Sequence, residues 1–148
     1  MKRITMLTMV LSLLLALAIP ALAADFGTAA EAKAMLERAV AALKANQAEA
    51  LANFTKGEGG FKDRDLYPFC GGPDGNFTAH PKLVGKSLKE LKDKAGKALG
   101  QEIYATATAD AISEVSYMWP RTAGSEPVQK ISYVTKVGDQ VCAVGYYK

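Results

Sequence analysis

The sequence contains only two cysteines and one histidine, which limits the chemistry that these side chains can perform. Cys70 and His80 could mimic a thiol–imidazole pair, but the turn residues between them predict a hairpin with the two on partner strands near its open end. The sequence has no Gly-x-Ser-x-Gly, His-Glu-x-x-His or Cys-x-x-Cys motif. His80 alone supplies too few ligands for a metal or a haem. We therefore expect no enzymatic activity and no cofactor.

A disulfide between Cys70 and Cys142 is the favoured use of the two cysteines if the chain is exported. Such a bridge would close a loop of about 70 residues and would contribute roughly 4 kcal/mol in the chain-entropy model. Two buried free thiols and a shared metal are the alternatives. A reducible bridge in a small redox protein is a further alternative.

The first residues have the pattern of a secretory signal peptide. Lys2 and Arg3 precede an apolar run from Met6 to Ile19, and Ala21-Leu22-Ala23 forms a small-x-small cleavage pattern. We predict cleavage near Ala23 and a periplasmic or secreted protein. A membrane anchor is the alternative, but the apolar run is short for a span of about 20 residues.

Cleavage would remove two basic residues and leave 16 basic against 15 acidic residues, a net charge of +1. This balance argues against a dedicated nucleic-acid-binding protein. Residues 24–148 have the length of one domain, and we expect them to form a single domain.

A long amphipathic helix is predicted from Thr28 to about Phe54. Thr28 and Glu31 form a capping box, and apolar residues recur at helical spacing as far as Phe54. Asn46 could break this helix into two helices in line, so both arrangements remain open. Gly57 is a good stop signal.

Five strands are predicted by β-branched and aromatic residues between turn residues. Strands at 67–70 and 76–80 are joined by a turn at Asp74-Gly75. Three further strands are predicted at 112–119, 128–137 and 140–147.

The segment 81–100 between these strands is rich in lysine. Ser87 could cap a short helix that runs through Asp93, and a second helix is predicted for 97–110. The lysines could form a surface for an anionic partner, but a solvated helix face is the favoured interpretation.

Several short motifs, in this order, resemble the single Cache domain family of extracytoplasmic PAS-like sensor domains. They are Tyr67-Pro68-Phe69, Asp74-Gly75, Ala79-His80-Pro81, Leu83-Val84-Gly85-Lys86, Asp93-Lys94-Ala95-Gly96-Lys97, Tyr117-Met118-Trp119-Pro120, Lys130-Ile131-Ser132-Tyr133-Val134 and Val144-Gly145-Tyr146-Tyr147. The resemblance implies an α+β fold with a long N-terminal helix packed on a five-stranded antiparallel sheet. It also implies that the first and last strands are neighbours, which would bring Cys70 close to Cys142.

The resemblance further implies a pocket for a small molecule, often a short carboxylate or an amino acid. Receptor members continue into a membrane helix and an output domain, whereas this sequence ends at Lys148 just after the last strand. We therefore expect a free-standing sensor domain that reports to a membrane partner such as a receptor or kinase.

Candidate ligand-binding residues follow from the resemblance and from the needs of such a pocket. Tyr117 and Trp119 share one face of their strand and could form an aromatic wall, although core packing would explain them equally well. Lys130, at the family's lysine position, could pair with a carboxylate through a charge-assisted hydrogen bond. The other candidates are His80 and Arg64, together with the hydroxyl donors Tyr67 and Tyr133.

An alternative hypothesis is a structural or protein-interaction domain of the cell envelope that binds no metabolite. In that case the long helix would provide a surface for a homodimer or for another partner.

Overall fold

The computed structural model describes residues 24–148. The predicted signal peptide, residues 1–23, lies outside the described residues. Within the described part, no helix is both long enough and apolar enough to span a membrane.

Two consecutive helices form the N-terminal part of the fold. Helix α1 (Ala29–Ala45) begins with the predicted capping box between Thr28 and Glu31. Helix α2 (Gln47–Lys56) begins at Asn46, whose side chain accepts a hydrogen bond from the Glu49 N–H group. Asn46 has an extended backbone (φ −156°), so it ends one helix and caps the next, and the chain forms two helices in place of one.

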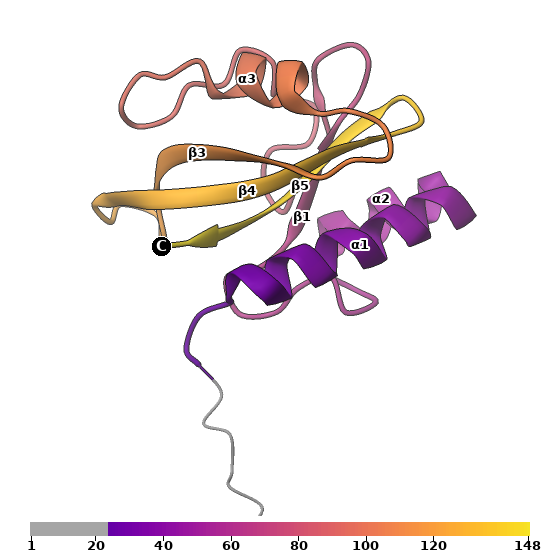
Figure 1. Ribbon diagram of the computed structural model, residues 1–148, viewed down its shortest axis with the longest axis horizontal. Helices are drawn as coiled ribbons and strands as arrows, with labels where there is room; N and C mark the ends of the chain where they lie inside the picture. Colours follow the sequence, from indigo (N-terminus) through magenta and orange to yellow (C-terminus); the bar gives the residue numbers. More distant parts are fainter. Residues whose placement is uncertain (1–23) are drawn as a thin grey trace, which may run out of the picture.

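Five antiparallel strands form one sheet in the order β2-β1-β5-β4-β3. The strands are β1 (Pro68–Gly71), β2 (Phe77–Ala79), β3 (Ser113–Pro120), β4 (Pro127–Val137) and β5 (Gln140–Tyr147). The two helices cover one face of this sheet, as Figure 1 shows for α1 below the strands. The predicted α+β fold is confirmed, and the first and last strands are neighbours.

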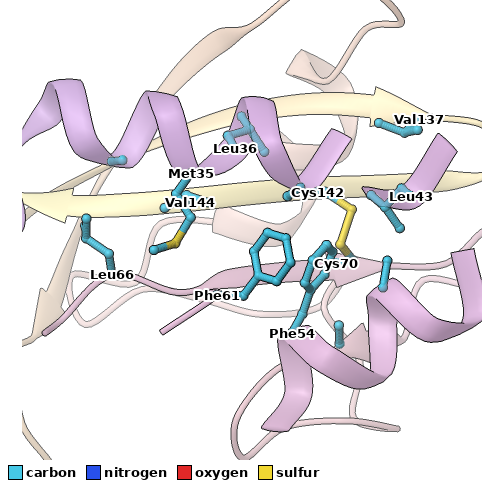
Figure 2. Packing of buried hydrophobic residues seen from close by; sticks show 14 residues of the cluster. Met35, Leu36, Leu43, Phe54, Phe61, Leu66, Cys70, Val137, Cys142 and Val144 are labelled. Atoms are coloured by element: carbon cyan, nitrogen blue, oxygen red, sulfur yellow. A yellow bond between two sulfur atoms is a disulfide. The ribbon is translucent and has the colours of Figure 1, made fainter. Parts of the chain in front are cut away.

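The core on the helix side of the sheet encloses a disulfide. Cys70 of β1 lies directly opposite Cys142 of β5, and their Sγ atoms are bonded at 2.06 Å. Figure 2 shows the bridge beside the rings of Phe54 and Phe61, in the same cluster as Met35 and Leu36 of α1. Both cysteines are fully buried, and the predicted pairing of Cys70 with Cys142 is confirmed.

A second layer covers the opposite face of the sheet. It consists of α3 (Leu99–Thr106) and the long segment 81–98 that connects β2 to this helix. In Figure 1 these parts lie above the sheet, on the side away from α1. Leu88, Leu99 and Ile103 are buried against Phe69 and Val115 of the sheet, so this layer encloses a second core.

The predicted short helix from Ser87 through Asp93 does not form. The N–H groups of Leu88 and Lys89 donate to the carbonyl of Gly75, and the Leu91 carbonyl accepts from the Gly100 N–H group. Because these backbone groups pair with distant parts of the chain, they are not free to form a helical ladder. Helix α3 is also shorter than the predicted 97–110 helix.

Candidate functional site

A small cavity of about 20 Å³ lies on the face of the sheet that carries α3. Aromatic and aliphatic side chains form most of its wall, and Lys130 and His80 are its two basic side chains. The lining residues are Tyr67, Phe69, Phe77, His80, Leu83, Leu91, Leu99, Ile103, Tyr117, Trp119 and Lys130. An apolar wall with a few polar groups is typical of a small-molecule site.

The register of three neighbouring strands positions one side of this cavity. Lys130 of β4 lies opposite Tyr117 of β3 and opposite Tyr147 of β5. Two positions further along β4, Ser132 lies opposite Gly145 of β5. A Cβ atom on Gly145 would lie 2.5 Å from Cε of Lys130, so the missing side chain makes room for the lysine.

Lys130 is a buried lysine without a carboxylate partner among residues 24–148. Lys130 is only 2% exposed. Its Nζ atom lies 4.9 Å from the ring centroid of Tyr67 and 4.8 Å from that of Tyr147. Burial lowers the pKa of Lys130 to about 8, and the positive charge of Lys62 acts in the same direction, while Asp65 opposes the shift. The amine is therefore mostly charged at neutral pH, but no carboxylate among residues 24–148 forms an ion pair with it.

His80 is held as a neutral imidazole with a defined tautomer. Its Nδ1 accepts a hydrogen bond of 2.9 Å from the Lys82 N–H group, so the proton of the neutral ring is on Nε2. Burial lowers the pKa of His80 to about 4, with further contributions from the charges of Lys130 and Lys82. The ring packs edge-on against Phe77 and Tyr67, which leaves an N–H donor in an aromatic environment.

Tyr117 and Trp119 form the β3 side of the wall. The Tyr117 hydroxyl and Ser132 Oγ are 2.8 Å apart and hydrogen-bonded, and burial raises the pKa of Tyr117. The rings of Tyr117 and Trp119 pack edge to face with their centroids 6.2 Å apart. The buried tyrosine therefore remains neutral and already has a hydrogen-bonding partner.

Asp93 fixes the edge strand that carries these two aromatics. Its Oδ2 accepts from the Met118 N–H group, and its Oδ1 accepts from the N–H groups of Ala95 and Lys97. Burial raises the pKa of Asp93, but these backbone donors outweigh it and hold the pKa below its usual value. Lys94 N–H also donates to the Met118 carbonyl, so the segment 93–97 pairs with the exposed edge of β3.

A wider groove of about 620 Å³ adjoins the cavity and opens to solvent. Tyr67, His80, Leu83 and Trp119 line both spaces. Arg121 lies in this groove with its guanidinium 4.2 Å and 4.6 Å from the ring centroids of Phe26 and Tyr147. The groove therefore lies directly beside the cavity and shares four side chains with it.

Five of the seven predicted ligand-binding residues line the cavity together: Tyr67, His80, Tyr117, Trp119 and Lys130. The structure places the other two elsewhere. Tyr133 lies three residues after Lys130 on β4, so it points to the opposite face, where it stacks on Tyr146 with centroids 5.7 Å apart. Arg64 lines only the outer groove, and it pairs with Glu31 at 2.7 Å and Asp63 at 2.9 Å.

Several cavity residues were not predicted from the sequence. They are Phe69, Phe77, Leu83, Leu91, Leu99 and Ile103, with Gly145 behind Lys130. The apolar residues have the pattern of ordinary core positions, so nothing local distinguishes them. Gly145 did carry a signal, because a glycine inside a strand often marks a close approach of another group.

Acidic, histidine and cysteine side chains do not gather at this cavity. In the part of the chain that the structure describes, no group of three or more such residues could hold a metal ion. The cavity therefore combines the cation of a buried lysine, an imidazole N–H donor and an apolar wall.

Comparisons with known proteins identify the family of this chain. A family model described as a Cache domain matches residues 31–147. A stretch of 56 residues, 38% of this chain, is 39% identical to the methyl-accepting chemotaxis protein McpP of Pseudomonas putida strain KT2440. That match spans only 10% of the length of McpP.

Two solved structures share the fold. The periplasmic sensor domain of a chemotaxis protein has a TM-score of 0.58 and 26% identity, covering 78% of this chain and 86% of that one. A Cache chemosensory domain that was described for its carboxylic acid recognition has a TM-score of 0.55 and 24% identity, covering 78% of this chain and 84% of that one. The chain belongs to the Cache domain family, which is a family of sensor domains and not of enzymes.

Proposed function

We propose that this protein is an exported sensor domain that binds a small carboxylate in the cavity at Lys130. The observation that carries the proposal is a buried ammonium group without a carboxylate partner among the described residues, enclosed by an aromatic wall. A buried charge is costly unless it is paired. A carboxylate ligand would supply the missing partner and would form a charge-assisted hydrogen bond.

The other cavity residues have roles that fit the same ligand. The Nε2–H group of His80 is a second donor for a carboxylate oxygen. Tyr67, Tyr117 and Trp119 exclude water, which strengthens both polar contacts. The cavity of about 20 Å³ has room for little more than one water-sized group, so the carboxylate alone would enter it and the rest of the ligand would lie in the outer groove.

The same proposal includes a route for the signal. The similarity to a segment of a chemotaxis receptor and to a periplasmic sensor domain supports a role in signal transduction at the membrane. We place the protein in the periplasm or outside the cell, with a leader cleaved near Ala23 and a single domain over 24–148. A membrane receptor or kinase would be the partner, and α1 would provide the surface for a homodimer.

A thermal-shift screen of the exported protein against short carboxylates and amino acids tests the proposal. A ligand at about 100 times its dissociation constant adds roughly 2.7 kcal/mol to the free energy of unfolding, which raises the melting temperature by several degrees. Lys130→Met should abolish the ligand-induced shift. Lys136→Met, which removes an exposed lysine from the same strand, should retain it.

Two results would contradict the proposal. One is a panel in which no carboxylate raises the melting temperature. The other is a shift of equal size in the wild type and in Lys130→Met, which would place the site away from the cavity. The absence of any ligand would favour an envelope interaction domain, and pull-down of a single envelope protein would then support that function.

A further inference from the structure

The positive charge of the described chain is concentrated in one segment. Residues 81–97 contain six lysines and two acidic residues, a net charge of +4. The other described residues carry ten basic and thirteen acidic side chains, a net charge of −3. This segment therefore has the opposite sign from the rest of the domain, which gives the molecule a strong charge asymmetry.

The lysines of this segment keep their charge available to solvent. All six are exposed, namely Lys82, Lys86, Lys89, Lys92, Lys94 and Lys97. Among the residues that the structure describes, only Lys97 of these six forms an ion pair, with Glu102. The carboxylate of Asp93 is directed inward to backbone N–H groups, so it does not neutralise the surface.

Hydrogen bonds at both ends hold the backbone of the segment that carries these lysines. At one end, Phe77 of β2 donates its N–H group to the Lys86 carbonyl and accepts from the Gly85 N–H group. At the other end, the segment pairs with Met118 at the edge of β3. Figure 1 shows the loops beside α3 on the side of the sheet away from α1. The charges therefore project from a preformed outer layer.

Val84 is an exposed apolar residue that stands between two lysines in the sequence. Val84 is 52% exposed and is one of two large apolar residues so exposed in the described chain. It is followed by Gly85, whose left-handed backbone (φ 83°) forms the turn, and it is flanked by Lys82 and Lys86. An apolar tip between cations is the pattern of a loop that touches the headgroup region of a bilayer.

We propose that the segment 81–97 is a docking surface for anionic phospholipid, with Val84 in contact with the headgroup boundary. The residue type favours a lipid surface over a specific acidic peptide, because lysine is a compact point charge and lacks the planar fork with which arginine selects single carboxylates. No arginine occurs in this segment. The surface would hold the domain close to the membrane where its signal is delivered, and its lysines are separate from Lys130 of the cavity.

Co-sedimentation with lipid vesicles tests this docking surface. The exported protein should bind vesicles of phosphatidylcholine mixed with phosphatidylglycerol and should not bind phosphatidylcholine alone. Added salt should weaken the binding. The triple variant Lys86→Glu, Lys89→Glu, Lys92→Glu should reduce the partition coefficient by more than a hundredfold, since each lysine near an anionic surface contributes about fivefold.

A matched control keeps the change in net charge the same. Lys33→Glu, Lys56→Glu, Lys136→Glu reverses three exposed lysines elsewhere and should bind vesicles like the wild type. Val84→Ser should weaken binding to a smaller degree. Equal losses in the two triple variants, or equal binding to both kinds of vesicle, would overturn the proposal. Binding to polyglutamate without binding to vesicles would overturn it in favour of an acidic protein partner.

Discussion

The ammonium group of Lys130 lies between two tyrosine rings, 4.9 Å from the centroid of Tyr67 and 4.8 Å from that of Tyr147. The ring faces attract a cation, but each contact is worth only about 0.5–2 kcal/mol. Such contacts are weaker than a hydrogen-bonded carboxylate. The folded protein therefore contains a cation that is partly stabilised and that gains free energy from an anionic ligand.

Lys130→Met should stabilise the protein in the absence of ligand. The pKa of this lysine falls from 10.5 in the unfolded chain to about 8 in the fold, so the unfolded chain binds more protons between these values. The free energy of unfolding contributed by this group consequently rises with pH from about 8 to 10.5. Urea denaturation should show a gain of about 1–3 kcal/mol for the variant at pH 7, shrinking toward pH 10. A variant less stable than the wild type at pH 7 would refute this account of Lys130.

Carboxylate binding should weaken in alkaline solution. Below pH 8 the lysine carries its proton before the ligand arrives, so affinity should be nearly constant there. Above pH 8 the ligand must bind together with a proton, and affinity should fall by up to about tenfold per pH unit. Isothermal titration calorimetry at pH 7 and pH 9 measures this change. A constant affinity over that range would show that the charge on Lys130 does not contribute.

Gly145→Ala should impair the site through Lys130. The new Cβ atom would lie 2.5 Å from Cε of Lys130 and 2.6 Å from Oγ of Ser132, so both side chains must move. We expect at least a tenfold loss of ligand affinity and a destabilisation of about 1–3 kcal/mol. In a double-mutant cycle with Lys130→Ala, the cost of Gly145→Ala for stability should shrink, because the lysine stem is gone. Additive costs would indicate that the two residues do not conflict.

Asp93→Ala should loosen the edge of the sheet at β3. The variant leaves three backbone N–H groups, those of Met118, Ala95 and Lys97, without their acceptor. Hydrogen bonds to charged groups are worth about 1.5–3 kcal/mol each, so we expect a loss of several kcal/mol of unfolding free energy. Hydrogen exchange should become faster at the Met118 amide. Unchanged protection at that amide would contradict the proposed role of Asp93.

Local patterns in the sequence predicted much of the fold. The capping box at Thr28 and the turn at Asp74-Gly75 depend on neighbouring residues, and the structure contains both. The segment 81–98 was predicted less well, because its backbone forms hydrogen bonds with residues outside the segment. These partners are Gly75 in the hairpin turn and Met118 in β3. Ser87 is a suitable helix cap, but hydrogen bonds to other parts of the chain determine the conformation of this segment.

Strand alternation predicted part of the cavity lining. Tyr117 and Trp119 share a face by that rule and line the cavity together. Tyr133 was predicted as a ligand donor together with Lys130, although the same rule puts residues three apart on opposite faces, and in the structure Tyr133 packs on the helix side of the sheet. The contributions of Leu99 and Ile103 depend on how α3 docks on the sheet, which no short stretch of sequence specifies.

The disulfide also determines which face of β1 belongs to the cavity. Cys70 faces the helices, whereas its neighbour Phe69 faces the cavity, and the bond to Cys142 permits only one alignment of β1 with β5. A slip by one residue would exchange these two faces and would put Phe69 under α2. The Cys70–Cys142 disulfide on the helix side of the sheet therefore fixes the position of Phe69 in the cavity wall on the other side.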